Sequence, residues 1–296
     1  KYKVDTIYHA AAYKHVPMVE DNIISGVQNN VFGTVNLVDA SHESSVKNFI
    51  LISTDKAVRP TNIMGATKRL SELIIQSANL SNGKAIFSAV RFGNVLGSSG
   101  SVIPKFERQI QKGGPVTVTH PDITRFFMTI KEAAQLVIQA GAMSKGGEIY
   151  LLDMGSSVKI LDLAKTMINL AGFGFYMNGQ NKPNGNSIEI SYSGLRPGEK
   201  LYEELLVDDS SSKSEHSSIF LENNFSMDPI LLKKYLKNIK QACSELDEEK
   251  IIRILSEMPL EYSKQADFEP QSSKIKGEKK GSKNSISKDF MKHITP

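Results

Sequence analysis

The chain has 296 residues, of which 40% are apolar and 23% are charged, so it can bury the core of one large domain or two small ones. The formal net charge is +4, and the segment from Lys264 to Pro296 alone, with eight lysines and four acids, accounts for it, so no basic face typical of a nucleic-acid-binding domain is indicated. The chain has a single cysteine, Cys243, which excludes an intrachain disulfide. It contains no run of about 18 apolar residues, so the sequence predicts no membrane-spanning helix.

Strands and helices alternate in the first hundred residues. Residues 4–9 (VDTIYH) predict a buried strand, residues 20–44 a long helix, and residues 48–54 (NFILIST) a second buried strand. A helix over residues 64–81 and a strand over residues 85–92 follow. Continuous apolar runs are typical of strands covered on both faces. This order predicts an α/β fold with a doubly wound parallel sheet.

After residue 102 the pattern is less regular, and from residue 263 onward few large apolar residues occur, which predicts a disordered basic tail. The other expectations are helices over 103–113, 131–143 and 160–171 and in two stretches between 228 and 258, strands over 116–119, 148–153 and 188–193, a loop over 172–186, and a helix that begins in 201–207.

The run from Ser53 to Lys68 (STDKAVRPTNIMGATK) begins at the carboxyl end of a predicted parallel strand, where ligands bind in open α/β sheets. Thr54, Asp55 and Lys56 place a hydroxyl, an acid and a base side by side, and Lys68 lies on the next helix. A neighbouring acid and base can shift each other's pKa. On residue types alone, the run fits either a catalytic site or a capped strand end with a surface ion pair.

This run resembles the active-site segment of extended short-chain dehydrogenases/reductases, and more narrowly that of the bacterial nucleotide-sugar 4,6-dehydratases. In that family Ser/Thr-Asp-Lys follows a strand and Tyr-x-x-x-Lys lies on the next helix. Lys68 matches the family lysine, whereas Met64 stands in the place of the usual tyrosine and is neither an acid nor a base. The large, membrane-anchored subgroup is similar in carrying methionine here. The catalytic set implied by the resemblance is Thr54, Asp55, Lys56, Met64 and Lys68, with Asp55, Thr54 with a water, or Lys68 as the base at sugar carbon C4.

Other segments are similar to the family's NAD-binding positions, and NAD is therefore the implied cofactor. The loop after the first strand would pack against NAD through small residues, which allow close approach of the backbone. The glycines of RFGNVLGSSG do not have the spacing of a dinucleotide fingerprint. The cofactor-binding residues implied by the resemblance are His9, Ala10, Ala11, Ala12, Asn30, Ser53, Lys68 and Val95.

A third group of positions resembles the family's contacts with the sugar nucleotide. Arg125 (DITRFFMT) and Arg196 (LRPGEKLYEEL) match residues that hold the diphosphate and ribose, and arginine suits phosphate because its planar fork makes paired hydrogen bonds. No metal is expected. The substrate-binding residues implied are Lys14, Asn94, Ile103, Arg125, Arg196 and Glu199.

The resemblance covers about residues 4–262 and implies NAD-dependent 4,6-dehydration of a UDP-sugar, with UDP-N-acetylglucosamine as the expected substrate. It implies that residues 1–100 are the later part of an NAD-binding domain, that residues 101–262 mainly bind the sugar nucleotide, and that 263–296 form the tail. Because the chain opens in a strand-like run without methionine, we expect a missing first half with the glycine-rich loop and an inactive isolated chain.

The resemblance also sets expectations for partners and location. We expect a homo-oligomer that binds a UDP-sugar, binds no nucleic acid and makes no membrane contact through this segment. The expected location is the cytoplasm, or the cytoplasmic face of the inner membrane if the full-length parent carries transmembrane helices. Two other functions stay open: a nucleotide-sugar 4-epimerase, and a non-catalytic relative that only binds the sugar nucleotide.

Overall fold

The larger part of the molecule is a six-stranded sheet in the order β1-β2-β3-β8-β13-β12. The computed structural model describes residues 2–80, 84–183, 185–204, 211–222 and 226–263. Strands β1, β2, β3 and β8 are parallel, and β13 and β12 extend the sheet in antiparallel fashion. The expected doubly wound α/β fold is therefore confirmed. The strands are β1 (Thr6–His9), β2 (Asn48–Ile52), β3 (Ile86–Arg91), β8 (Ile149–Leu152), β12 (Ser212–Lys213) and β13 (Ile219–Leu221).

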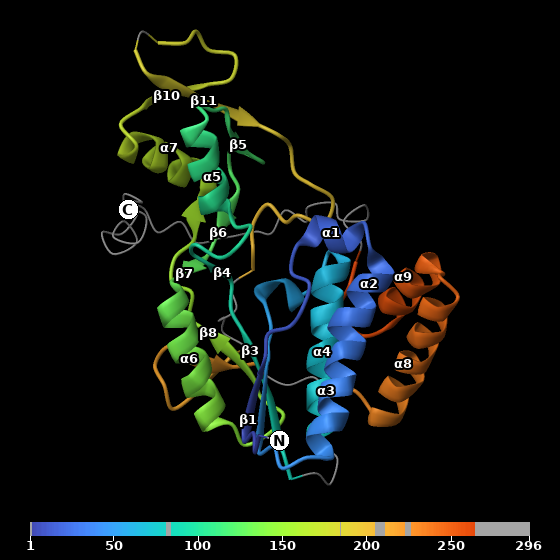
Figure 1. Cartoon of the computed structure of the whole chain (residues 1–296). Coiled ribbons are helices and arrows are strands. Elements are labelled where there is room, and N and C mark those ends of the chain that lie inside the picture. The colour runs from blue at the N-terminus through green and yellow to red at the C-terminus, as the bar shows by residue number, and fades with distance from the viewer. Residues whose placement is uncertain (1, 81–83, 184, 205–210, 223–225, 264–296) are drawn as a thin grey trace.

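Helices cover both faces of this sheet (Figure 1). Side chains alternate along β2, so that Phe49 and Leu51 join the core beneath α4 while Ile50 joins the core beneath α6. This two-sided burial explains why the strands have continuous apolar sequences. The helical segments are α1 (Val16–Glu20), α2 (Ile23–Val27), a π-helical turn (Gln28–Phe32), α3 (Gly33–His42) and α4 (Ile63–Asn79) on one face, and α6 (Ile130–Met143) on the other.

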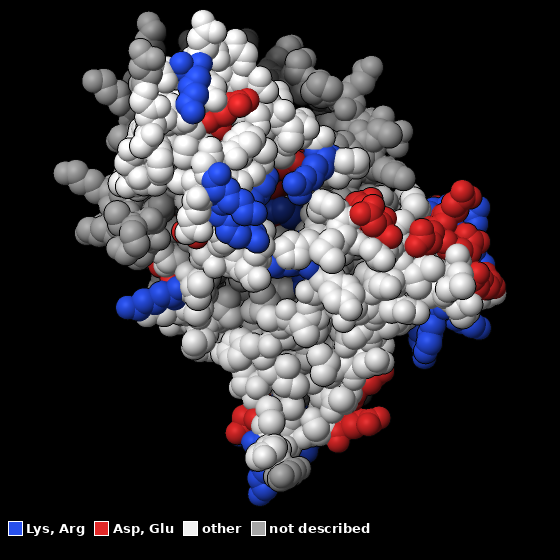
Figure 2. Space-filling model, turned by 45° about the horizontal axis from the view of Figure 1, so that its top comes forward, with Lys and Arg blue, Asp and Glu red and all other residues white. Residues whose placement is uncertain are grey.

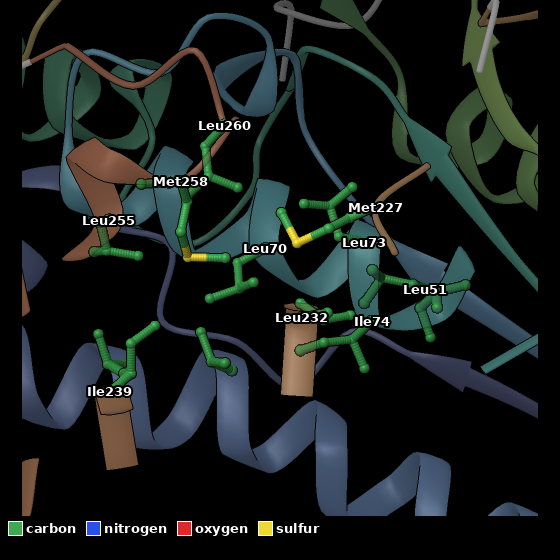
Figure 3. Close-up of a cluster of buried hydrophobic side chains, with 14 of the residues drawn as sticks. Leu51, Leu70, Leu73, Ile74, Met227, Leu232, Ile239, Leu255, Met258 and Leu260 are labelled. Atoms are coloured by element: carbon green, nitrogen blue, oxygen red, sulfur yellow. The ribbon is translucent and has the colours of Figure 1, made fainter. Parts of the chain in front are cut away.

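Helix α4 is enclosed, because α8 (Pro229–Ser244) packs on its side away from the sheet and α9 (Glu248–Glu257) packs beside it on α8 and α2. Figure 3 shows Leu70 and Leu73 of α4 among side chains from both of these helices and from the segments that flank them. Nearly all residues of α4 are buried. The helix therefore holds in fixed positions the side chains that it directs toward the ends of the strands. Among the described residues, no helix combines the length and apolar character needed to cross a membrane.

A smaller part lies above the carboxyl ends of β1, β2 and β3 (Figure 1). Its three-stranded parallel sheet, in the order β10-β11-β5, packs against α5 and α7 around a separate core that includes Phe106 and Leu163. Two short strand pairs, β4 with β7 and β6 with β9, lie between the two parts. The elements are β4 (Asn94–Val95), α5 (Val102–Gln111), β5 (Val116–Val118), β6 (Thr124–Arg125), β7 (Phe127–Met128), β9 (Val158–Lys159), α7 (Ile160–Leu170), β10 (Gly174–Met177) and β11 (Ser187–Tyr192).

The predicted helix over 20–44 is interrupted. A break at Asn22 separates α1 from α2, and a π-helical turn then precedes α3. The turn contains Asn30, whose backbone carbonyl accepts hydrogen bonds from the Thr34 and Ser71 hydroxyls. Such π-helical turns are frequent at functional sites. Four-residue apolar spacing does not reveal one, because the apolar side chains still face the core.

Two other expectations differ from the structure. Residues 172–186, predicted as a loop, contain β10, whose Phe175 and Met177 pack against the smaller core and whose backbone pairs with β11. The helix expected to begin in 201–207 is absent over residues 201–204, where Glu203 and Glu204 are instead engaged in ion pairs. The predicted disordered tail lies, except for Ser263, outside the described residues.

Candidate functional site

A cleft opens where β1, β2 and β3 end, between the two parts of the molecule. Its largest hollow has a volume of about 370 Å³ and is lined by segments that follow these three strands and by α4. Two smaller hollows of about 220 and 150 Å³ share lining residues with it and with each other, so the three form one continuous cleft. On the face shown in Figure 2, Lys and Arg side chains gather around a hollow. The cleft is therefore suited to an anionic ligand.

Asp55 and Lys56 form a close acid–base pair at the end of β2. Lys56 Nζ lies 2.9 Å from Asp55 Oδ1, and the Thr54 hydroxyl donates a hydrogen bond of 2.8 Å to the same oxygen. Thr54 also caps the short 3-10 helix Asp55–Ala57, because its hydroxyl accepts from Lys56 N. Both side chains are thereby held at the strand end.

The second carboxylate oxygen of Asp55, Oδ2, is buried and accepts no hydrogen bond from any described residue. It lies over Gly93, where an added Cβ would be 3.1 Å away from it. A buried polar atom without a partner is costly, and each one in a native structure calls for an explanation, such as a catalytic role or a bound ligand or water. The structure therefore leaves one oxygen of this carboxylate available to a ligand or a proton.

Lys56 begins a chain of alternating charges. Its Nζ lies 3.3 Å from Glu203 Oε1, Arg125 Nε lies 3.4 Å from the same oxygen, and Arg125 Nη2 lies 3.3 Å from Glu199 Oε1. Burial alone disfavours the charged form of Lys56, but Asp55 and Glu203 outweigh burial and raise its pKa above the ordinary lysine value. In the resting structure Lys56 is thus held as an ammonium.

Lys68 lies on the cleft side of α4, one helical turn after Met64, and both residues line the largest hollow. Asn62 caps this helix by accepting a hydrogen bond of 2.8 Å from Gly65 N. Burial lowers the pKa of Lys68 to about 8, although the carboxylate of Glu72 acts in the opposite direction. No described residue accepts a hydrogen bond from the Lys68 ammonium, so it can bind hydroxyl groups of a ligand.

Replacing Lys68 by methionine should stabilise the fold near pH 7. The pKa of Lys68 is 10.5 in a model compound and about 8 in the folded chain, so below pH 8 the folded state bears the full cost of a buried ammonium. We expect a gain of about 1–3 kcal/mol in the free energy of unfolding at pH 7. The pH-dependent part of this gain should shrink between pH 8 and pH 10.5, where the folded lysine is neutral.

Urea unfolding at pH 7 and pH 10 measures this effect. The control is Lys131→Met, which changes an exposed lysine on α6 and should alter the free energy of unfolding by less than about 0.5 kcal/mol at both pH values. A Lys68→Met variant that is destabilised at pH 7, or whose gain is the same at both pH values, would show that the buried ammonium carries no such cost.

Gly65 brings α4 close to the turn Asp55–Ala57. A Cβ at this position would lie only 2.2 Å from the carbonyl oxygen of Lys56. We therefore expect Gly65→Ala to displace the Asp55–Ala57 turn, lower the free energy of unfolding by about 1–3 kcal/mol and reduce turnover. Gly33→Ala is the matched control, because no atom lies within 4 Å of its added Cβ, and it should be neutral or stabilising by up to about 1 kcal/mol. Equal effects in thermal unfolding would contradict this contact.

The residues implied in cofactor binding occupy different positions. Ala10, Ala12, Ser53 and Val95 line the largest hollow, as does Lys68, whereas Ala11 is exposed and outside the lining. His9 is buried behind the cleft, 3.0 Å from the Thr34 hydroxyl, and burial together with Lys68 lowers its pKa to about 4.

Asn30 also lies behind the cleft wall and not in its lining. It accepts a hydrogen bond from Tyr13 N (2.7 Å) and donates to Tyr13 O (3.1 Å) and to the Thr67 hydroxyl (3.0 Å). This amide therefore fastens the loop after β1 to α4.

The residues implied in substrate binding also differ in place. Lys14 lines the largest hollow, and Asn94 lines both this hollow and its neighbour. Arg125, Arg196 and Glu199 line the two smaller hollows. Ile103 is buried in the smaller core, and its neighbour Val102 lines the cleft instead.

Three charged residues that line the cleft, Lys105, Lys200 and Glu203, were not identified from the sequence. Glu203 contacts both Lys56 and Arg125, and Lys105 lines the same hollow as Arg196. The signal for Glu203 lies in LRPGEKLYEEL, where two further acids follow the matched Glu199. Burial lowers the pKa of Lys105, and the positive charge of the nearby Arg196 lowers it further. Among the described residues, no group of three His, Cys, Asp or Glu is placed to hold a metal ion.

Comparison with known proteins gives one family and several named relatives. The family described as polysaccharide biosynthesis protein matches residues 1–224. The capsular polysaccharide biosynthesis protein CapD of Staphylococcus aureus is 56% identical over 206 residues, which are 70% of this chain and 33% of that protein. A UDP-N-acetylglucosamine 4,6-dehydratase (inverting) of Campylobacter jejuni is 35% identical over 76% of this chain and 62% of its own. A UDP-glucose 4-epimerase of Rickettsia rickettsii is 37% identical over 72% and 59%.

The chain thus spans about a third of CapD and less than two thirds of the other two relatives. Among solved structures, Pen from Bacillus thuringiensis is similar with a TM-score of 0.65 and 36% identity, over 79% of this chain and 75% of that one. DesIV, a dTDP-glucose 4,6-dehydratase of Streptomyces venezuelae solved with NAD, has a TM-score of 0.57 at 19% identity, over 68% of this chain and 64% of its own, and supports the fold.

Proposed function

This chain belongs to the family of polysaccharide biosynthesis proteins, and on that premise we propose that its cleft carries out NAD-dependent 4,6-dehydration of a UDP-sugar. The buried acid–base pair Asp55–Lys56, with one carboxylate oxygen unpartnered, is the observation that carries the proposal. An elimination of water needs both a base and an acid within reach of adjacent carbons. The product would be a 4-keto-6-deoxy sugar for surface polysaccharide.

The largest hollow fits the nicotinamide and ribose portion of NAD. Its wall contains the small residues Ala10, Ala12 and Gly93, which permit close approach, and the unpartnered ammonium of Lys68 can donate to ribose hydroxyls. NAD, when bound, supplies the acceptor and later the donor of the hydride that moves from C4 to C6 of the sugar. The protein's own contribution is to orient the sugar and to move protons.

One proton transfer within the pair prepares it for elimination. At rest Lys56 is an ammonium 2.9 Å from Asp55. Transfer of its proton to Asp55 creates an uncharged amine and a protonated acid together. The amine then removes the proton from C5, and Asp55 donates a proton to the departing C6 hydroxyl, which leaves as water. This step restores the resting charges of the pair. When the hydride reaches C6, the Lys56 ammonium returns a proton to C5. The proton that the C4 base took from the C4 hydroxyl then recharges Lys56, so the net change is the loss of one water.

The base at C4 must be another group than Met64, which lines the cleft but cannot accept a proton. We assign this role to the neutral amine of Lys68, because a pKa of about 8 makes this form accessible near neutral pH, where general bases act best. A neutral amine still has hydrogens that it can donate to ribose hydroxyls. Thr54 donates its hydroxyl hydrogen to Asp55, and the Asp55 carboxylate is already engaged in the elimination pair.

The sugar nucleotide would extend from the largest hollow toward Arg125 and Arg196. Both arginines can pair with a diphosphate, and Arg125 would exchange its present contact with Glu199 for phosphate oxygens. We propose UDP-N-acetylglucosamine as the substrate, since the Campylobacter jejuni relative carries that name.

Mass spectrometry of the reaction of the intact protein with UDP-N-acetylglucosamine and NAD tests the proposal. The expected product has lost one water. A product of unchanged mass with altered C4 configuration would instead establish 4-epimerisation, the second candidate, which the epimerase name of the Rickettsia relative favours. Binding without any product would show a non-catalytic protein and would also refute the proposed dehydration.

A further inference from the structure

A second network of charges lies buried behind the cleft and takes no part in the chemistry proposed above. The carboxylate of Glu72 on α4 accepts hydrogen bonds from Arg91 Nε (2.7 Å), Arg91 Nη2 (2.6 Å) and Arg69 Nη1 (3.1 Å). Arg91 Nη1 also lies 2.8 Å from Glu222 Oε1. Glu72 and Arg91 are almost completely buried. Two arginines and two carboxylates thus neutralise one another, with Glu72 and Arg91 inside the fold and Glu222 half-buried at the edge of the network.

The same carboxylate holds the end of the neighbouring strand. The Ser53 hydroxyl donates a hydrogen bond of 2.5 Å to Glu72 Oε1. Ile52 pairs with Val90 across β2 and β3, so Ser53 and Arg91 follow as neighbours on the sheet face toward α4. Glu72 therefore joins the ends of two adjacent strands to one helix.

Both joined positions lead directly into the cleft. Ser53 precedes the Thr54–Lys56 segment, which contains the acid–base pair, and Arg91 precedes the Phe92–Asn94 segment, which lines the cleft wall. Asp55 N donates to Phe92 O at 3.1 Å, so the two segments also contact each other. A displacement of either strand end would therefore move the groups that face the ligand.

Helix α4, which Glu72 joins to the two strand ends, also carries Lys68. Met64, Lys68 and Glu72 are four residues apart and lie on one face of α4, with the first two in the cleft and Glu72 beneath them. Burial favours the protonated form of Glu72, but Arg91 and Arg69 outweigh it and lower its pKa, so the carboxylate is charged. That charge opposes the lowering of the Lys68 pKa by burial.

We propose that Glu72 is a positioning residue, whose single buried carboxylate sets the Asp55–Lys56 pair and Asn94 in place relative to Lys68. This role rests on the proposed function of the cleft. The carboxylate is too deep to touch the substrate and acts through Ser53, Arg91 and Lys68. Misplacement of catalytic groups by about 1 Å can lower a rate by about 100-fold, so a rigid junction at this point has a direct effect on turnover.

Ser53→Ala removes the bond to β2 and leaves the Glu72–Arg91 ion pair intact. Because Ser53 also lines the largest hollow, the affinity for NAD is measured beside kcat, and it should stay within twofold of wild type if Ser53 acts through Glu72 alone. Ser88→Ala is the matched control, since Ser88 is buried on the opposite face of β3 and its hydroxyl accepts a bond of 2.7 Å from Ser144. We expect Ser53→Ala in the intact protein to lower kcat at least tenfold with KM changed less than twofold. Ser88→Ala should retain kcat within twofold.

A second measurement separates the positioning role from the proposed function. NMR titration of labelled lysine side chains gives the pKa of Lys68 without any turnover. In Glu72→Gln this pKa should fall below its wild-type value, whereas in Ser53→Ala, which keeps the carboxylate, it should stay unchanged. An inactive wild-type protein would refute the dehydration alone, and the titration would still test Glu72.

Either of two results would overturn the positioning role. One is a Ser53→Ala variant with kcat within twofold of wild type. The other is a Glu72→Gln variant that folds and leaves the pKa of Lys68 unchanged. A Glu72→Gln variant that does not fold would leave the kcat of Ser53→Ala to decide, since that variant keeps the buried ion pair.

Discussion

Replacing Lys56 by alanine in the intact protein should lower kcat for dehydration by about 100- to 10,000-fold, the range that positioned acids and bases contribute. The amine proposed to remove the C5 proton would be absent, and Asp55 would lose the partner that lies 2.9 Å from it. Asp55→Asn should cause a loss of similar size, because an amide cannot donate a proton to the departing hydroxyl. Product formation followed by mass spectrometry measures both variants.

A matched control lies at the opposite end of the sheet. Lys47 forms an ion pair of 2.8 Å with Asp5, and both side chains are largely exposed. Lys47→Ala removes the same kind of contact and should leave kcat within twofold of wild type. Turnover that is undiminished in both Lys56→Ala and Asp55→Asn would exclude the pair from the chemistry.

Replacing Arg91 by methionine should lower the free energy of unfolding by about 3–5 kcal/mol, the cost of leaving one partner of a buried ion pair behind. Arg91 satisfies both oxygens of Glu72 and also contacts Glu222. The remaining carboxylate would keep only Arg69 and the Ser53 hydroxyl as partners. Urea unfolding at neutral pH measures the loss.

Arg59→Met provides the comparison for this variant. Arg59 pairs with Glu204, but its side chain is 66% exposed, and surface ion pairs contribute about 0–1 kcal/mol. The two substitutions make the same chemical change in different surroundings. Equal losses in the two variants would show that burial of the Arg91 network adds nothing to stability.

Much of the fold followed from the sequence because continuous apolar strands alternate with helices in the first hundred residues. The same pattern placed Thr54, Asp55 and Lys56 at a strand end, and the parallel-sheet rule placed that end beside the loops at Ala10 and Asn94. The structure brings these segments together in one cleft. Local sequence was sufficient here, because each group follows its own strand directly.

Contacts between segments distant in the sequence could not be predicted in the same way. Glu203 meets Lys56 across 147 residues of chain, in a segment whose irregular course no periodic pattern describes. The Ser53–Glu72–Arg91 junction could have been predicted in part, since alternation along β2 and β3 directs Ser53 and Arg91 to the same face. Ile103 could have been assigned to a core, because Ile103, Phe106 and Ile110 recur at helical spacing.

A crystal structure of the intact protein with NAD and UDP-N-acetylglucosamine would show whether the Asp55–Lys56 pair meets the sugar. We expect the sugar ring in the largest hollow, with Lys56 Nζ near C5 and Asp55 Oδ2 near the C6 hydroxyl, each within about 3–3.5 Å. A sugar bound away from both side chains, with Lys56 still held between Asp55 and Glu203, would contradict this expectation.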